Sequence, residues 1–108
     1  MASYLLIESR DPFDSNDVGN FYSMASGLAK DGHEVTLFLV QNGVLPAREG
    51  SAFTELAILA SAGVTVLADD FSLAERGITG ANLVGAVTAS PIEAVVDAMA
   101  DGAKAIWH

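Results

Sequence analysis

Two short apolar runs constrain the fold of this chain more than any other feature of its sequence. Val35–Val40 and Val64–Ala68 are β-branched, aliphatic or aromatic almost throughout, without alternation between apolar and polar positions. Such runs are typical of strands buried on both faces, as in the parallel sheets of α/β proteins. Ser3–Ile7 is a third short run of this kind and opens the chain. We therefore expect a parallel sheet covered by helices.

Segments with apolar residues at helical spacing lie between the predicted strands. Three helices are expected, ending at Gly32, Gly63 and Gly102. The apolar stripe of the first helix is Val18, Phe21, Ala25 and Leu28, and that of the second is Phe53, Leu56, Ala57 and Ala60. The stripe of the third helix is Ile92, Val95, Val96 and Met99. Ser90 is the expected N-cap of the last helix, with Pro91 at its first position.

The middle of the chain predicts shorter elements. Ser72 and Glu75 have the spacing of a capping box, which indicates a very short helix. Further strands are expected near Val84–Val87 and at Ala103–Trp107, whereas 41–50 reads as a loop. The complete alternation of strands and helices predicts a three-layer α/β/α fold with a mainly parallel five-stranded sheet. No linker divides the 108 residues, so we expect residues 1–108 to form a single domain and leave the strand order open.

Composition excludes several classes of function. Five Lys and Arg residues stand against 14 Asp and Glu residues, giving a net charge of −9, so neither nucleic acid nor an anionic membrane surface is an expected partner. The chain has no cysteine, which excludes disulfides, thiolate metal sites and cysteine nucleophiles. Neither a targeting segment nor a membrane span is evident, and we expect a cytoplasmic protein.

Polar side chains gather where the predicted strands end. In open parallel sheets, ligands bind beyond the carboxyl ends of the strands. The sequence assigns nine candidate ligand-binding residues to this edge: Arg10, Asp11, Gln41, Asn42, Arg48, Asp69, Asp70, Ser72 and Arg76.

The residue types at this edge argue against several familiar chemistries. His33 falls in a turn at the opposite edge and His108 is the last residue, so neither is expected to serve a catalytic triad or a metal site there. The first strand–helix loop has no glycine and carries aspartates, which repel phosphate. The spacing of Asp11, Asp14 and Asp17 matches no dedicated calcium loop. We predict no metal, no cofactor and no catalytic residue.

Asp69 and Asp70 form a close acidic pair that has two interpretations. One carboxyl could act as an acid or base, or Asp69 and Ser72 could cap the short helix without a catalytic role. Capping is our prediction. Arg48 and Arg76 could likewise hold an anion, but ion pairs with neighbouring glutamates are the simpler expectation.

Several segments together resemble the DsrE/DsrF-like family, which includes sulfur-relay subunits. They are the loop containing Pro12 before the first helix, Gly32–Val35, Asn42–Val44 and Leu73–Ile78. The resemblance covers nearly the whole chain and implies a parallel α/β fold that associates into trimers or hexamers. It also implies that sulfur-carrying members have a persulfide-bearing cysteine shortly before an Arg-Gly-Ile-like element.

The matching stretch here, Asp69–Ser72, contains no cysteine, and a serine hydroxyl cannot replace a thiolate. The chain is therefore similar to the DsrF-like subunits that lack the active cysteine. The resemblance implies a non-catalytic binding or structural subunit of a sulfur-relay assembly, which favours a role other than that of an enzyme. The alternative is a small-molecule-binding protein or an enzyme that uses Asp69, Asp70 and Arg76.

A homo-oligomer is also expected from the residues. Ile78–Val87 has no charged side chain, and its apolar residues exceed what one short strand can hide. We expect this segment to contact a neighbouring copy, and the resemblance selects a trimer or hexamer.

Overall fold

The computed structural model describes residues 2–51 and 53–108. These residues contain one sheet in the order β4-β3-β2-β1-β5, and every neighbouring pair of strands is parallel. The strands are β1 (Ser3–Glu8), β2 (Glu34–Leu39), β3 (Thr65–Asp69), β4 (Val87–Ser90) and β5 (Lys104–Trp107). The expected parallel α/β architecture is confirmed.

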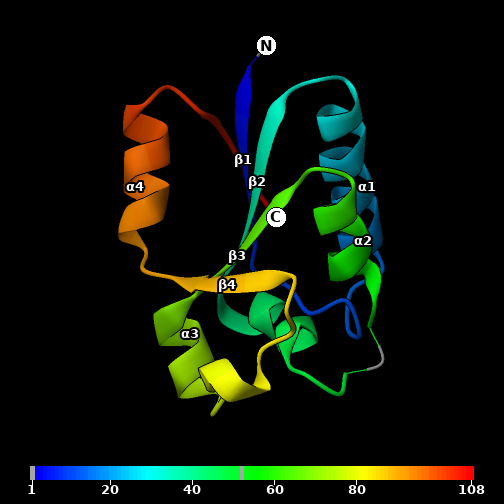
Figure 1. Ribbon diagram of the computed structural model, residues 1–108, viewed down its shortest axis with the longest axis vertical. Coiled ribbons are helices and arrows are strands. Elements are labelled where there is room, and N and C mark those ends of the chain that lie inside the picture. Colours follow the sequence, from blue (N-terminus) through cyan, green and yellow to red (C-terminus); the bar gives the residue numbers. More distant parts are fainter. Residues whose placement is uncertain (1, 52) are drawn as a thin grey trace.

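Helices cover both faces of the sheet (Figure 1). They are α1 (Asp17–Lys30), α2 (Glu55–Ser61), α3 (Asp70–Glu75) and α4 (Glu93–Ala100), with short 3₁₀ helices η1 (Gln41–Ala47) and η2 (Gly80–Asn82). α1 and α2 lie on one face and α4 on the other, while α3 and η1 lie near the carboxyl ends of the strands. The predicted loop over 41–50 therefore contains a 3₁₀ helix.

The two faces of the sheet are packed unequally. The larger core lies under α1 and α2 and includes Leu6, Val18 and Leu37, none of which is exposed to solvent. The smaller core lies under α4 and consists of five buried residues, Leu5, Ile7, Phe38, Val40 and Val95. A single eight-residue helix cannot cover a five-stranded sheet, so apolar side chains stay exposed on this side.

Two expectations for the last third of the chain are wrong. The fourth strand is Val87–Ser90 rather than Val84–Val87, and Ser90 belongs to it. α4 consequently begins at Glu93, and the Ser90 hydroxyl does not cap it. Of the predicted apolar stripe of α4, only Val95 is buried, because too little of the sheet lies beneath this helix.

The winding direction of the chain reverses beside β1. The chain passes from β1 through β2 and β3 to β4, and α4 then returns it to β5 on the other side of β1. The helix that follows β1 and the helix that precedes β5 therefore lie on opposite faces (Figure 1). In open parallel sheets such a reversal creates a crevice at the carboxyl ends of the two strands, the usual place for a ligand. Here that crevice lies beyond Glu8 and Trp107.

Gly43 allows η1 to lie directly against the end of β1. A Cβ atom at this position would collide with the carbonyl oxygen of Glu8, and the Glu8 oxygen also accepts a hydrogen bond from the Val40 amide at 3.0 Å. Only glycine permits so close an approach of two backbones. Among the described residues, no helix is long and apolar enough to cross a membrane.

Candidate functional site

A cavity of about 290 Å³ opens at the carboxyl edge of the sheet on the α4 side. We call it the Ser72 pocket, after the serine in its floor. Ten residues line it, from three strands, the residue that follows β2, η1, α3 and the start of α4: Ile7, Val40, Gln41, Asp69, Phe71, Ser72, Glu75, Ile92, Val95 and Trp107. Ile7 and Trp107 belong to β1 and β5, so the pocket borders the crevice where the winding reverses.

The floor of the Ser72 pocket is a closed hydrogen-bond network. Asp69 is the N-cap of α3, and its Oδ2 accepts from the Ser72 amide at 3.0 Å and from the Ser72 hydroxyl at 2.7 Å. The Ser72 oxygen in turn accepts from the Gln41 amide at 2.9 Å. Because Asp69 and Ser72 are both buried, these bonds satisfy groups that water does not reach freely.

Gln41 has an unusual backbone that allows this network to form. Its φ of 52° makes it the one described residue other than glycine with a positive φ. The left-handed conformation costs a β-carbon residue about 1–2 kcal/mol. Here it turns the chain from β2 into η1 and directs the Gln41 amide at Ser72. The hydroxyl thus joins α3 to η1.

The walls of the pocket are apolar and strongly exposed. Phe71 is 67%, Trp107 62% and Ile92 50% exposed. Apolar walls around a few fixed polar groups are typical of binding pockets. The arrangement can hold an apolar group against a hydrogen-bonded floor.

The structure brings together only some of the predicted site residues. Gln41, Asp69 and Ser72 line the pocket. The other six do not: Arg10, Asp11, Asn42, Arg48, Asp70 and Arg76. Asp70 faces a separate hollow beside η2, and exposed Arg48 pairs with Leu83 through a β-bridge. Arg10 is exposed, and the Asp11 carboxylate accepts from the Phe13 amide at 3.0 Å.

Arg76 closes the rim beside the pocket. Its Nη2 donates to the Asn42 side-chain oxygen at 3.0 Å and its Nη1 to the Ser72 carbonyl at 3.1 Å. Glu75 lies 3.6 Å from Nη1, so the expected ion pair with a neighbouring glutamate is present. These residues do not assemble the acidic site of the alternative interpretation, because Asp69 binds Ser72, Asp70 lines another hollow and Arg76 binds Asn42.

The expected capping box of α3 is shifted along the chain. Ser72 is the third residue of the helix rather than its N-cap, and Asp69 is the residue that caps it. The predicted pairing of Asp69 with Ser72 at the start of this helix is present, although the roles of the two side chains differ.

Sequence reasoning missed a second polar cluster at the same edge. Glu8 is entirely buried at the end of β1, and its two carboxylate oxygens lie 2.8 and 2.9 Å from Nδ1 of His108. We did not expect His108, the last residue, to serve the cleft. Parallel pairing of β1 with β5 instead places it directly beside Glu8, which only the strand order reveals.

Tyr22 lies near the same cluster on the α1 side. Its hydroxyl is buried and has no hydrogen-bond partner among the described residues. Burial, together with the negative charges of Glu8, Glu55 and Asp11, raises the pKa of Tyr22 above its ordinary value. Tyr22 is therefore neutral over the physiological range.

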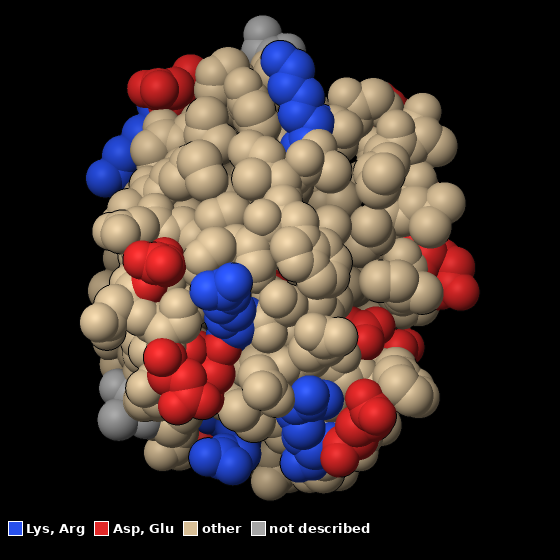
Figure 2. Space-filling view, turned by 180° about the vertical axis from the view of Figure 1, so that it is seen from behind, with Lys and Arg blue, Asp and Glu red and all other residues tan. Residues whose placement is uncertain are grey.

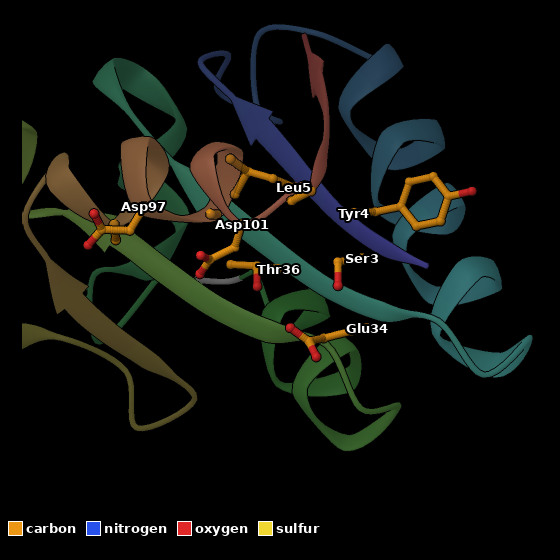
Figure 3. A pocket seen from close by; sticks show the side chains of 10 residues that line it. Ser3, Tyr4, Leu5, Glu34, Thr36, Asp97 and Asp101 are labelled. Carbon is orange, nitrogen blue, oxygen red and sulfur yellow. The ribbon is translucent and has the colours of Figure 1, made fainter. Parts of the chain in front are cut away.

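Another hollow, of about 350 Å³, lies at the opposite edge of the sheet (Figure 3). Glu34 at the start of β2, Asp97 of α4 and Asp101, which follows α4, are among its lining residues, and all three side chains are exposed. This is the amino end of the strands, where parallel sheets rarely bind ligands. Within residues 2–51 and 53–108, no group of three or more His, Asp or Glu side chains could hold a metal ion.

The surface of the molecule separates charged from uncharged areas. Figure 2 shows a broad area without charged side chains across the middle and upper right of the face opposite to that of Figure 1. Lys, Arg, Asp and Glu gather mainly along its margin and lower part. Such an uncharged area suits a contact with another macromolecule better than a contact with a polyanion.

Comparison with known proteins identifies one family and several solved structures with a similar fold. Residues 2–107 match the sequence model of the DsrE/DsrF-like family. The YchN protein of E. coli has a similar structure, with a TM-score of 0.90 and 19% identity over 100% of both chains. No curated protein matches the chain.

Two proteins described as having unknown function are also similar in structure. MTH1491 of Methanobacterium thermoautotrophicum gives a TM-score of 0.83 at 20% identity, covering 99% of this chain and 98% of its own. BT1422 of Bacteroides thetaiotaomicron gives 0.79 at 18% identity, covering 98% and 95%. At these identities the likeness establishes the fold.

Proposed function

This chain belongs to the DsrE/DsrF-like family, and from that premise we propose that it is a non-catalytic binding subunit related to intracellular sulfur transfer. In this proposal it binds a partner or ligand in the Ser72 pocket and does not itself carry a persulfide. The family match covers nearly the whole chain, which supports reading the pocket as the counterpart of the sulfur-carrying site.

The state of the Ser72 hydroxyl is the observation that carries this proposal. A sulfur carrier needs a thiolate, and the chain has no cysteine. Ser72 occupies the stretch before Arg76-Gly77-Ile78, but its hydroxyl donates to Asp69 and accepts from Gln41. Both interactions tie the side chain to the fold, and a hydroxyl cannot replace the thiolate that a persulfide requires.

The walls of the pocket support binding without covalent chemistry. Phe71, Ile92 and Trp107 expose a large part of their apolar surface around a floor whose polar groups are already satisfied. A ligand gains affinity here mainly by covering apolar surface, at about 25 cal/mol per Å². We propose that a segment of a sulfur-relay partner with an apolar side chain fits this surface.

The enzyme alternative has less support. An acid–base mechanism in the predicted cleft requires Asp69, Asp70 and Arg76 to converge on one substrate. Asp69 is committed to capping α3, Asp70 faces another hollow and Arg76 is bound to Asn42. We therefore keep binding as the proposed function of this edge.

Trp107 provides a direct test, because it is the single tryptophan of the chain and lines the pocket. The probe is a short uncharged peptide carrying a cysteine persulfide, with its free-thiol form for comparison. We expect a saturable change of Trp107 fluorescence, and no added sulfur in the intact mass of the denatured protein. No fluorescence response would contradict the binding role, and a covalent sulfur adduct would contradict the non-carrying role.

A matched pair of variants locates the binding. Ile92→Glu places a charge on the pocket wall and should weaken peptide binding about tenfold or more. Ile58→Glu makes the same change at a comparably exposed isoleucine of α2, on the other face of the sheet, and should leave the affinity unchanged. Equal effects of the two variants would place the peptide elsewhere.

A further inference from the structure

We infer that Glu8 and His108 form a nucleophilic dyad at the crevice between β1 and β5, able to accept an acyl group from an uncharged or cationic ester. The dyad lies on the α1 side of the sheet, whereas the Ser72 pocket lies on the α4 side. The inference goes beyond the proposed function, which is non-catalytic binding in the Ser72 pocket, and concerns a second site.

The geometry of the pair is tightly defined. The Glu8 side chain is fully buried, and its oxygens lie 2.8 and 2.9 Å from Nδ1 of His108. The Arg10 amide donates to the same carboxylate at 3.2 Å. The His108 ring stacks on Phe21 with centroids 5.2 Å apart, and the His108 amide donates to the Ile7 carbonyl at 2.8 Å. The imidazole is thus held from several sides.

Hydrogen bonding fixes which ring nitrogen of His108 carries the proton. An ionised carboxylate only accepts hydrogen bonds, so Nδ1 must be the donor to Glu8. In the neutral ring Nε2 then has a free lone pair, which makes it a base and a nucleophile. A buried carboxylate that orients a histidine through Nδ1 is the arrangement found in Ser-His-Asp enzymes.

The His108 ring is partly exposed, with 22% of its side-chain surface accessible to solvent. No hydrogen bond to Nε2 occurs among the described residues, so no other group of this part of the chain occupies its lone pair. His108 lines a shallow hollow with four residues of α1, namely Asp17, Asn20, Phe21 and Met24. A small electrophile can therefore approach Nε2.

Position and charge define the substrate class. The dyad sits at the carboxyl ends of β1 and β5, where the winding reverses and ligands usually bind. Asp17 in the hollow and the net charge of −9 disfavour anionic substrates such as phosphate esters or acyl phosphates. Carboxylic esters without negative charge remain suitable.

The transfer balances without an external oxidant or metal. The Nε2 lone pair attacks the acyl carbon, the bond from that carbon to the ester oxygen breaks, and its electron pair leaves with the alkoxide or phenolate. The acylated ring is a cation, which the negative charge of Glu8 stabilises. Water then attacks the acyl carbon, releasing the carboxylic acid and one proton and restoring the neutral ring.

His33 is an internal control, since it is the other of two histidines. Its Nδ1 accepts from the Ala2 amide at 3.1 Å, so the neutral ring carries its proton on Nε2 and has no carboxylate partner for Nδ1. With p-nitrophenyl acetate as the probe, we expect the rate of acetylation of His108 to be at least about tenfold higher than that of His33. Acetylation of both at the same rate would overturn the inference.

Variants separate the positioning role of Glu8 from a purely structural one. His108→Asn should abolish the fast phase of p-nitrophenolate release, and His33→Asn should leave it intact. Glu8→Gln retains an oxygen that accepts from Nδ1 but removes the charge, and it should slow acetylation about tenfold or more while the fold is kept.

NMR of the imidazole nitrogens gives a readout independent of reactivity. The neutral ring of His108 should carry its proton on Nδ1, and that of His33 on Nε2. An Nε2-protonated His108, or full reactivity in Glu8→Gln, would contradict the dyad.

Discussion

The Tyr22 hydroxyl is buried without a hydrogen-bond partner in the described part of the chain, close to the Glu8 carboxylate. An unsatisfied buried hydroxyl destabilises the folded state, so Tyr22→Phe should raise the free energy of unfolding by about 1 kcal/mol. Urea denaturation at neutral pH measures this change. A loss of stability would mean that the hydroxyl has a partner, such as an ordered water molecule.

Tyr22 also predicts that the free energy of unfolding depends on pH in the alkaline range. Burial and nearby carboxylates raise the pKa of Tyr22 in the folded state, so the unfolded chain ionises first, near pH 10. The contribution of Tyr22 to the free energy of unfolding is fully present below about pH 10 and declines as the pH rises further. The reason is that Tyr22 loses its proton in the unfolded chain before it does so in the folded state, which stabilises the unfolded chain. Tyr22→Phe should therefore lose less stability than the natural protein between neutral and strongly alkaline pH. Parallel losses would contradict the raised pKa.

Single residues differed in how well the sequence predicted them. The Asp69–Ser72 pair could be placed at the start of a short helix from spacing alone, since capping is a local interaction. The Glu8–His108 pair could not, because the two residues are 100 positions apart and meet only through the pairing of β1 with β5. The signal that could have suggested it is a glutamate directly after an apolar strand run.

At the level of elements, the packing of η1 against β1 depends on Gly43. A methyl group at this position would meet the Glu8 carbonyl, so Gly43→Ala should cost about 2 kcal/mol or more. Gly27→Ala is the control, because Gly27 lies inside α1 with open space around it, and alanine should stabilise that helix by about 0.5–1 kcal/mol. Thermal unfolding of both variants checks the pair, and similar effects would contradict the close approach.

Buried strands were the elements best predicted from sequence. β2 and β3 follow from their continuous apolar runs, and α1 follows from its stripe. The sequence predicts β4 a few residues too close to the N-terminus, because Ile78–Val87 has no periodic pattern. Tertiary contacts decide which residues of β4 pair with β3. α4 kept its predicted apolar pattern but not its burial, since a sequence does not reveal how much sheet lies beneath a helix.

For the whole molecule, we propose a homo-oligomer, but not through the segment first expected. Ile78 and Val87 are buried in the main core, and Leu83 and Val84 are partly buried against it. An exposed apolar surface lies instead on α4, where Val96 is 62% and Met99 53% exposed. The family resemblance implies a trimer or hexamer.

Light scattering at micromolar concentration tests this assembly, with three or six chains as the expected mass. Val96→Asp should dissociate it, because charge is poorly tolerated in the core of an interface. Ile58→Asp, at a similarly exposed residue of α2, should leave it intact. A monomeric natural protein would refute the assembly, and dissociation by Ile58→Asp alone would place the interface on the other face.

The overall architecture was predictable, whereas the position of the site within it was not. Alternating strands and helices predict a parallel sheet, and local patterns identify its carboxyl edge. Which of the nine candidate residues converge depends on strand order and on the left-handed turn at Gln41. Nothing in the local sequence around a glutamine predicts a positive φ, so the link between η1 and α3 emerges only from the structure.

The central claim, that the Ser72 pocket is a binding site unsuited to carrying sulfur, is tested most directly by placing a thiol there. In Ser72→Cys, burial and the adjacent Asp69 carboxylate should raise the pKa of the thiol and suppress the reactive thiolate. Ser23→Cys provides an exposed thiol on α1 as the control.

Both variants are incubated with a persulfide donor, and the gain of one sulfur atom is followed by intact mass. We expect Ser72→Cys to gain sulfur at less than about one tenth of the rate of Ser23→Cys. An equal or faster gain at position 72 would contradict the account and identify the pocket as a sulfur acceptor that lacks only its cysteine.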